Sequence, residues 1–162
     1  MTPQRPQQGR PRDHRPHQGS APPPRAIRDP QPQPCRYRGA EGQLDRFWVD
    51  GGAQVAAESF RDLPSTQLRR FFSEVKGLGR QLSRAKGDDS RQQAWARIHP
   101  QFAMLKSRVV YAAGRLGKDM PGAFVQFVIN HVAWVESVED FEAFLSHFEA
   151  VVGFHRYLNE KG

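Results

Sequence analysis

Residues 104–115 read MLKSRVVYAAGR, and the spacing of their side chains decides how the chain folds. At about 100° per residue, an α-helix here places one set of apolar side chains on a single side. That set is Phe102, Leu105, Val109, Ala112 and Leu116. Arg108, Tyr111 and Arg115 fall together on another side. The apolar side indicates a protein core, whereas two guanidinium groups beside an aromatic ring suit a phosphate backbone and an unpaired base.

The same spacing of three and four residues recurs along the rest of the chain and predicts helices. Short helices are expected within residues 44–60, and Pro64 marks a boundary. Pro100 ends or kinks a helix because it lacks an amide proton and disfavours helical geometry at His99. The longer helices are expected at residues 65–84, 90–99, 102–116, 121–135 and 137–158. No segment alternates with period two, so the fold class is all-α, a compact bundle of about five main helices.

Three helix starts have capping residues. Ser65 or Thr66 is expected to cap the helix after Pro64, and Ser90 with Gln93 forms a capping-box pattern. Ser137 is expected to cap the last helix.

Residues 1–40 differ in composition from the rest of the chain. They contain most of the prolines and, besides Met1, only Ile27 and Tyr37 as hydrophobic residues larger than alanine, apart from Cys35. Such a segment buries too little apolar surface to fold, so a disordered Pro/Gln/Arg-rich tail is predicted. Residues 41–162 then form a single helical domain. Cys35, the only cysteine, excludes a disulfide framework, and the absence of an apolar leader or membrane-length run favours the cytoplasm.

Charge is unevenly distributed. Residues 64–118 contain twelve Lys or Arg against three acids, a net charge of +9, whereas residues 119–162 contain two against seven, a net charge of −5. Basic residues on a helix often serve solubility alone, but acids at i+4 would then be interspersed, and only Glu74 and Arg70 offer such a pair. The helix at 65–84 aligns Arg69, Lys76, Arg80 and Arg84, with Arg70 at the margin. We interpret this side as contacting a nucleic-acid backbone.

Tyr111 admits two interpretations. Its helical phase, shared with Arg108 and Arg115, favours exposure and stacking on a base. Alternatively, Tyr111 and Met104 bury against the short N-terminal helices.

Signatures of catalysis are lacking: the chain has no Gly-rich phosphate loop, nucleophile elbow or His-Glu-x-x-His pair. His131, His147 and His155 lack acids at ligand spacing, so a solvated or core-edge position is expected rather than a metal site. Glu142 and Glu149 are expected to face solvent. Neither a cofactor nor a small-molecule substrate is predicted.

Three blocks together resemble a known family. They are residues 64–72 (PSTQLRRFF), 105–115 (LKSRVVYAAGR) and 148–157 (FEAVVGFHRY), and they occur in the order found in the Csm small subunit of type III-A CRISPR effector complexes. The resemblance spans about residues 63–158. This sequence departs from the family pattern in its long Pro/Arg-rich tail and in Gly153-Phe154, where Ala-Tyr is more usual.

This resemblance implies a non-catalytic, RNA-binding ribonucleoprotein subunit of antiviral defence. It would be present in several copies and line the groove where guide RNA pairs with target RNA. Target cleavage would belong to a neighbouring backbone subunit, and signalling-nucleotide synthesis to the large subunit. The block at 148–157 would mainly pack. The predicted RNA-binding residues are Arg69, Arg70, Lys76, Arg80, Arg84, Lys106, Arg108, Tyr111, Arg115 and Lys118. A helical protein-protein adaptor and a free-standing RNA-binding regulator are the alternatives.

Overall fold

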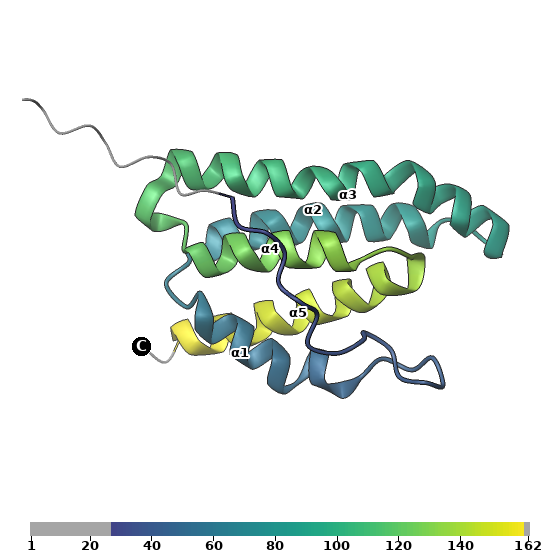
Figure 1. Cartoon of the computed structure of the whole chain (residues 1–162), viewed down its shortest axis with the longest axis horizontal. Helices are drawn as coiled ribbons and strands as arrows, with labels where there is room; N and C mark the ends of the chain where they lie inside the picture. The colour runs from purple at the N-terminus through teal and green to yellow at the C-terminus, as the bar shows by residue number, and fades with distance from the viewer. Residues whose placement is uncertain (1–26, 161–162) are drawn as a thin grey trace, which may run out of the picture.

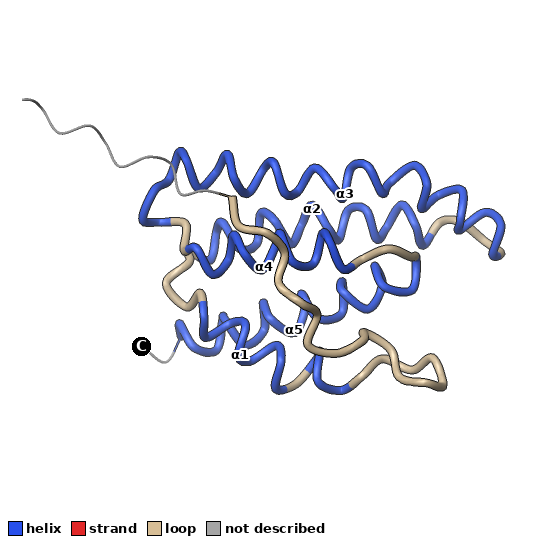
Figure 2. Tube along the Cα trace, viewed as in Figure 1, coloured by secondary structure: helices blue, strands red, loops and turns tan. Residues whose placement is uncertain are grey.

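The apolar spacing of the sequence produces helices in a computed structural model that describes residues 27–160. The elements are η1 (Arg46–Val49), α1 (Gly51–Ser59), α2 (Ser65–Ser83), α3 (Asp88–Leu116), η2 (Gly117–Asp119), α4 (Gly122–Trp134) and α5 (Val138–Glu160). Within these residues no strand forms, and the one isolated β-bridge joins Arg38 to Leu44. The predicted all-α bundle of about five helices is therefore confirmed (Figure 2).

The helices α2 and α3 run side by side along one edge of the molecule (Figure 1). The helix α4 packs on α3, and α5 packs on both α1 and α2. The predicted apolar stripe of α2 is buried at Leu68, Phe71, Val75, Leu78 and Leu82. Gly79 permits the close approach of α5, because a Cβ atom there would lie 2.7 Å from Leu145 Cδ2.

Pro100 does not interrupt the chain as predicted. It lies inside α3, which continues unbroken on both sides of it. Proline removes one helical hydrogen bond and costs about 3 kcal/mol in a helix interior. Ile98 and Phe102 flank it, are 2% and 0% exposed, and each gains about 1.5–3 kcal/mol by burial, so packing outweighs this cost. The expected helices 90–99 and 102–116 are thus one helix, and α1 brings the number of α-helices to five.

The predicted caps are partly correct. Ser137 Oγ accepts a hydrogen bond of 3.1 Å from the Asp140 backbone N–H, as expected. In contrast, α2 begins at Ser65 itself, so the N-cap is Pro64, without a side-chain bond. The helix α3 begins at Asp88 rather than after Ser90, because Gly87 turns the chain with a φ of 82° and two acids follow in the first turn.

The predicted tail reaches residue 40, but its last part belongs to the fold. Residues 1–26 lie outside the described residues. Residues 27–37, which we name the strap, cross α4 and lead to Tyr37, which is 2% exposed (Figure 1). Tyr37 packs on Trp48 at 4.7 Å between ring centroids, and the Trp48 indole donates to the Arg36 carbonyl. One buried aromatic ring thus ties this proline-rich segment to the helices.

The three histidines were expected in solvent or at the edge of the core, but they lie inside the core. His131, His147 and His155 are all 3% exposed or less. His131 shares a hydrogen bond of 2.5 Å with the Tyr37 hydroxyl, and His147 Nδ1 donates to the Trp48 carbonyl. Single-helix periodicity could not reveal these partners, because they come from residues more than ninety positions away in sequence.

Burial of these imidazoles disfavours their charged form. It lowers the pKa of His131 well below its usual range, with His147 as a second cause, and lowers the pKa of His147 to about 4 despite the bond to Trp48. The two ring centroids are 4.9 Å apart.

Acidification should therefore destabilise the fold. The unfolded chain binds protons on these histidines below pH 6.5, whereas the folded chain does not, so the free energy of unfolding should fall as pH drops from about 6.5 towards 4. His147 alone should account for about 3 kcal/mol at the acidic limit. Urea unfolding of wild type and His147→Gln measures this. The matched control is His99→Gln, at an exposed histidine. If the free energy of unfolding of wild type depends on pH no more steeply than that of His147→Gln, the assignment of a buried neutral His147 is wrong.

Phe148 on α5 should be a principal stabilising residue. It is 1% exposed, and its ring lies 5.4 Å from those of Phe72 and Phe127. Phe148→Ala should lower the free energy of unfolding by about 3–5 kcal/mol because it leaves a cavity between α2, α4 and α5. Denaturant unfolding monitored by circular dichroism tests this, with Tyr111→Ala, at a 72% exposed ring, as the control. Equal losses in the two variants would refute the core assignment.

Candidate nucleic-acid interface

All ten sequence-predicted contact residues are exposed on the described surface. Five lie on or directly after α2 and the others on α3 or in η2. They are Arg69, Arg70, Lys76, Arg80, Arg84, Lys106, Arg108, Tyr111, Arg115 and Lys118. None of these side chains is buried in the core, so each is accessible to a partner.

An ion pair fixes how α2 and α3 face one another. Arg108 Nη1 on α3 donates to Glu74 Oε2 on α2 at 2.5 Å. The two helices run antiparallel, so Arg70, one turn before Glu74 on α2, and Tyr111, one turn after Arg108 on α3, lie towards the same end of this line. A groove of about 230 Å³ follows this line and is lined on its α3 side by Gln101, Leu105 and Arg108. We call this line the α2–α3 seam.

Tyr111 and Met104 lie on the outside of the bundle. The exposed fraction is 72% for Tyr111 and 51% for Met104. Of the two interpretations left open by the sequence, exposure is therefore correct, and burial against the short N-terminal helices is wrong. An exposed ring one turn from Arg108 is placed to stack on a base while the guanidinium group contacts phosphate.

Arg97 also belongs to the α2–α3 seam, and the sequence analysis missed it. Arg97 lies eleven residues before Arg108, and Arg115 lies seven residues after it. In one continuous helix both spacings return to within about 20° of the same direction, so the three guanidinium groups share one side of α3. The missed signal was this spacing, which the supposed break at Pro100 concealed.

The ten residues do not form one smooth face. Lys76 Nζ lies 5.5 Å above the Phe72 ring, which packs on Phe148 of α5, so Lys76 lies on the α5 side of α2. Arg69, seven residues earlier, shares that side. Lys106 is two residues from Arg108, about 200° around α3. The seam therefore unites Arg70, Arg97, Arg108, Tyr111 and Arg115, while Arg69 and Lys76 form a second basic stripe and Lys106 lies apart.

Electrostatically, the seam is basic with one internal acid. The only ion pair that the described residues give to any of the ten is that of Arg108 with Glu74. The sequence had offered Glu74 to Arg70 instead. The facing helix supplies the closer guanidinium group, which a single-helix pattern cannot show. Arg70 and Arg115 remain available for an external anion.

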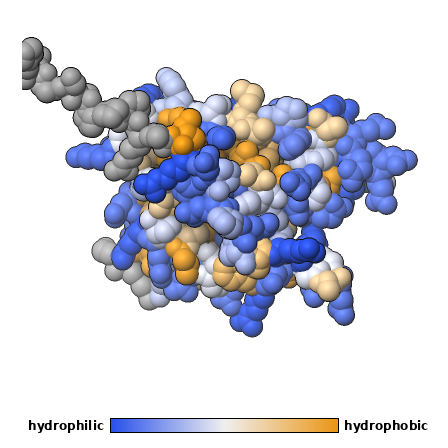
Figure 3. All heavy atoms as spheres, in the orientation of Figure 1, coloured by the Kyte–Doolittle hydropathy of each residue, from blue (hydrophilic) through white to orange (hydrophobic). Residues whose placement is uncertain are grey.

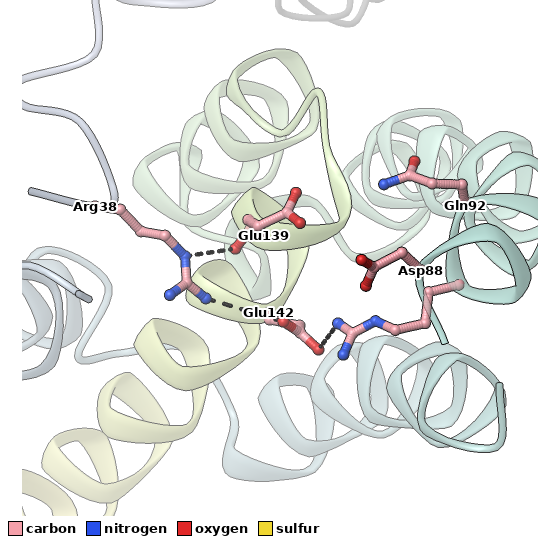
Figure 4. A pocket seen from close by; sticks show the side chains of 6 residues that line it. Arg38, Asp88, Gln92, Glu139 and Glu142 are labelled. Atoms are coloured by element: carbon pink, nitrogen blue, oxygen red, sulfur yellow. Dashed lines mark hydrogen bonds and ion pairs between the residues drawn. The ribbon is translucent and has the colours of Figure 1, made fainter. Parts of the chain in front are cut away.

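A second polar cluster lies where α3 meets α5 (Figure 4). Arg91 donates to Glu142 at 2.5 Å, and Arg38 approaches the other oxygen of the same carboxylate at 3.9 Å. Glu142 is thus partly buried and paired rather than solvated, because two arginines reach it from other elements, whereas Glu149 is exposed as predicted. A cavity of about 430 Å³ lies here, and Asp88 and Glu139 also line it.

These ion pairs balance charge between elements. Among residues 27–160, no group of three or more His, Cys, Asp and Glu side chains is arranged to hold a metal ion. None of the helices described there is both long and apolar enough to cross a membrane. The visible face in Figure 3 is mostly hydrophilic, with scattered hydrophobic patches.

A protein-family model described as Csm2 Type III-A matches residues 47–161. The chain belongs to the Csm2 Type III-A family. The resemblance to the Csm small subunit of type III-A CRISPR complexes is therefore confirmed, and the match includes all ten predicted contact residues as well as Arg97. No curated protein and no solved structure matches this chain. As a Csm2 protein it is a subunit of a type III-A effector complex together with other Csm subunits.

Proposed function

We propose that this Csm2 protein is a non-catalytic RNA-binding subunit that supports guide RNA and target RNA through the α2–α3 seam. The observation that carries the proposal is the alignment of Arg97, Arg108 and Arg115 on one exposed side of α3, within the region matched by the family. Tyr111 stands between two of these residues and is 72% exposed. Further copies of the same chain and other Csm subunits are the proposed protein partners, and the cytoplasm the proposed location.

The seam suits recognition of an RNA backbone rather than of a sequence. Guanidinium groups bind phosphate oxygens through paired N–H donors, and an aromatic ring stacks on any base. An A-form guide-target duplex is recognised mainly through its shape, phosphates and 2′-hydroxyl groups, while base pairing supplies the sequence specificity. The groove along the α2–α3 seam is open to the surface rather than shaped to enclose a base edge. Binding is therefore expected to depend weakly on RNA sequence and strongly on salt.

Removing two seam charges should weaken RNA binding. In Arg108→Ala/Arg115→Ala, each lost phosphate contact should lower the slope of log affinity against log salt by about 0.7 for single-stranded RNA. Fluorescence anisotropy across a salt series measures this. Stability should change by at most about 1 kcal/mol, because the Arg108 pair with Glu74 is half-exposed.

The matched control removes the same charge elsewhere. Arg46→Ala/Arg156→Ala also loses two arginines, but these lie on η1 and α5, each in an exposed i,i+4 ion pair. We expect the control to keep a slope close to wild type. Equal salt slopes for the seam variant and the control variant would contradict RNA binding at the seam. If wild type and both variants all fail to bind RNA, a protein-protein adaptor would be favoured.

Glu74 should act as an internal competitor of RNA. Glu74→Gln removes the carboxylate that pairs with Arg108 and raises the net charge of the seam by one. RNA affinity should therefore rise about two- to five-fold, the equivalent of roughly 0.5–1 kcal/mol. Anisotropy with the same RNA tests this. Weaker binding by Glu74→Gln would mean that the pair positions Arg108 for RNA, and would overturn the competitive role.

A further inference from the structure

Met104 and Tyr111 are the two large hydrophobic side chains that α3 exposes. Both lie on the same side of the helix as the arginines of the seam. Measured from Arg97 at 100° per residue, Met104, Arg108, Tyr111 and Arg115 all fall within about 40°. The rest of the exposed surface of α3 consists of polar side chains, alanine, glycine and proline. The exposed apolar surface of this helix is therefore concentrated at the seam.

Charged and apolar side chains alternate along this line. The order is Arg97, Met104, Arg108, Tyr111 and Arg115, and the line is about 27 Å long at a rise of 1.5 Å per residue. Each of the two apolar side chains has an arginine within about 6 Å along the helix axis. A protein interface instead has a contiguous apolar centre surrounded by a polar rim. The alternation therefore favours a ligand that is itself charged and apolar in turn.

An unpaired RNA strand is such a ligand, because it exposes both its phosphates and the flat faces of its bases. Arginine binds the phosphates, and a tyrosine ring stacks on a base of any kind. Methionine has a flexible, polarisable side chain that adapts to aromatic surfaces. Met104 and Tyr111 are about 10 Å apart along the axis, compared with about 3.4 Å between stacked neighbours in a duplex, so they reach two bases that are not adjacent.

A paired RNA offers the seam less. In an A-form duplex the base faces are stacked inside the helix, so a flat protein surface reaches phosphates and 2′-hydroxyl groups. The arginines of the seam would then find partners, whereas Met104 and Tyr111 would not. The two apolar side chains therefore distinguish an unpaired strand from a paired one, and this distinction does not require any base to be identified.

We infer that the α2–α3 seam binds RNA whose bases are unpaired, with Met104 and Tyr111 each covering the face of one base, and holds paired RNA by its backbone alone. The inference rests on the proposed function and adds the class of RNA that the seam prefers. It also makes Met104 a contact residue. Affinity then has two parts, a salt-dependent part from the arginines and a part from the base faces that salt changes little.

Two pairs of substitutions in the full chain separate these parts. The apolar variant, Met104→Ala/Tyr111→Ala, removes both base contacts, keeps every charge and keeps good helix formers at exposed positions. The apolar control, Val49→Ala/Val55→Ala, removes two exposed apolar side chains from η1 and α1. Circular dichroism should show the same helicity for both. Tyr111→Phe keeps the ring and should bind RNA like wild type.

Anisotropy across a salt series with three probes of one length tests the inference. The probes are a mixed-sequence single-stranded RNA, the same strand without its bases, and the duplex with its complement. The apolar variant should bind the single strand about ten-fold more weakly than wild type, because each stacked base contributes to affinity. Its salt slope should stay unchanged, and so should its affinity for the abasic strand and the duplex. The apolar control should match wild type on all three probes.

The contrary results separate the inference from the proposed function. Wild-type affinity of the apolar variant for the single strand, or an equal loss on the abasic strand, overturns the inference. An equal loss in the apolar control overturns it as well. Neither result affects the seam if Arg108→Ala/Arg115→Ala still lowers the salt slope. If that slope stays at the wild-type value on every probe, the proposed function of the seam fails, whatever the apolar variant does.

Discussion

The burial of Ile98 and Phe102 on either side of Pro100 keeps α3 a single helix, and the proposed interface depends on that continuity. Both side chains are buried, whereas Pro100 itself is exposed, so the proline ring takes no space from the core. A break at this point would rotate Arg97 away from Arg108. Because α3 is continuous, three guanidinium groups lie along one of its sides, and α2 packs beside it.

Charge along the seam reflects a balance between holding the helices together and leaving cations free. Glu74 crosses to Arg108 and is the only acid paired there within the described residues. Its pairing contributes little to stability because both groups are partly exposed. Most of the binding energy between α2 and the rest of the bundle comes instead from its buried apolar side, with Phe71 against Phe124 as one contact. The basic residues of α2 therefore contribute little to stability and are available to bind a polyanion.

The sequence predicts features that depend on one helix and misses those that depend on two. The buried stripe of α2, the exposure of its arginines and the cap at Ser137 follow from local spacing. The partner of Glu74 and the buried bonds of His131 and His147 come from elements far away in sequence, so no local pattern reveals them. Tyr37 shows the same limit, since a proline-rich context predicts disorder but cannot show that one aromatic ring finds a place beside Trp48 and His131. Arg97 was not predicted because Pro100 was expected to end the helix, although the apolar spacing continues on both sides of Pro100.

The proposed contact between the α2–α3 seam and RNA can be tested by photo-cross-linking. Purified protein bound to a uridine-rich single-stranded RNA would be irradiated, digested and mapped by mass spectrometry. Because Tyr111 is an exposed ring between Arg108 and Arg115, we expect cross-links within residues 104–115, and their loss in Tyr111→Ala. Cross-links confined to α1 or α5, with Tyr111 unmodified in protein that binds RNA, would contradict it.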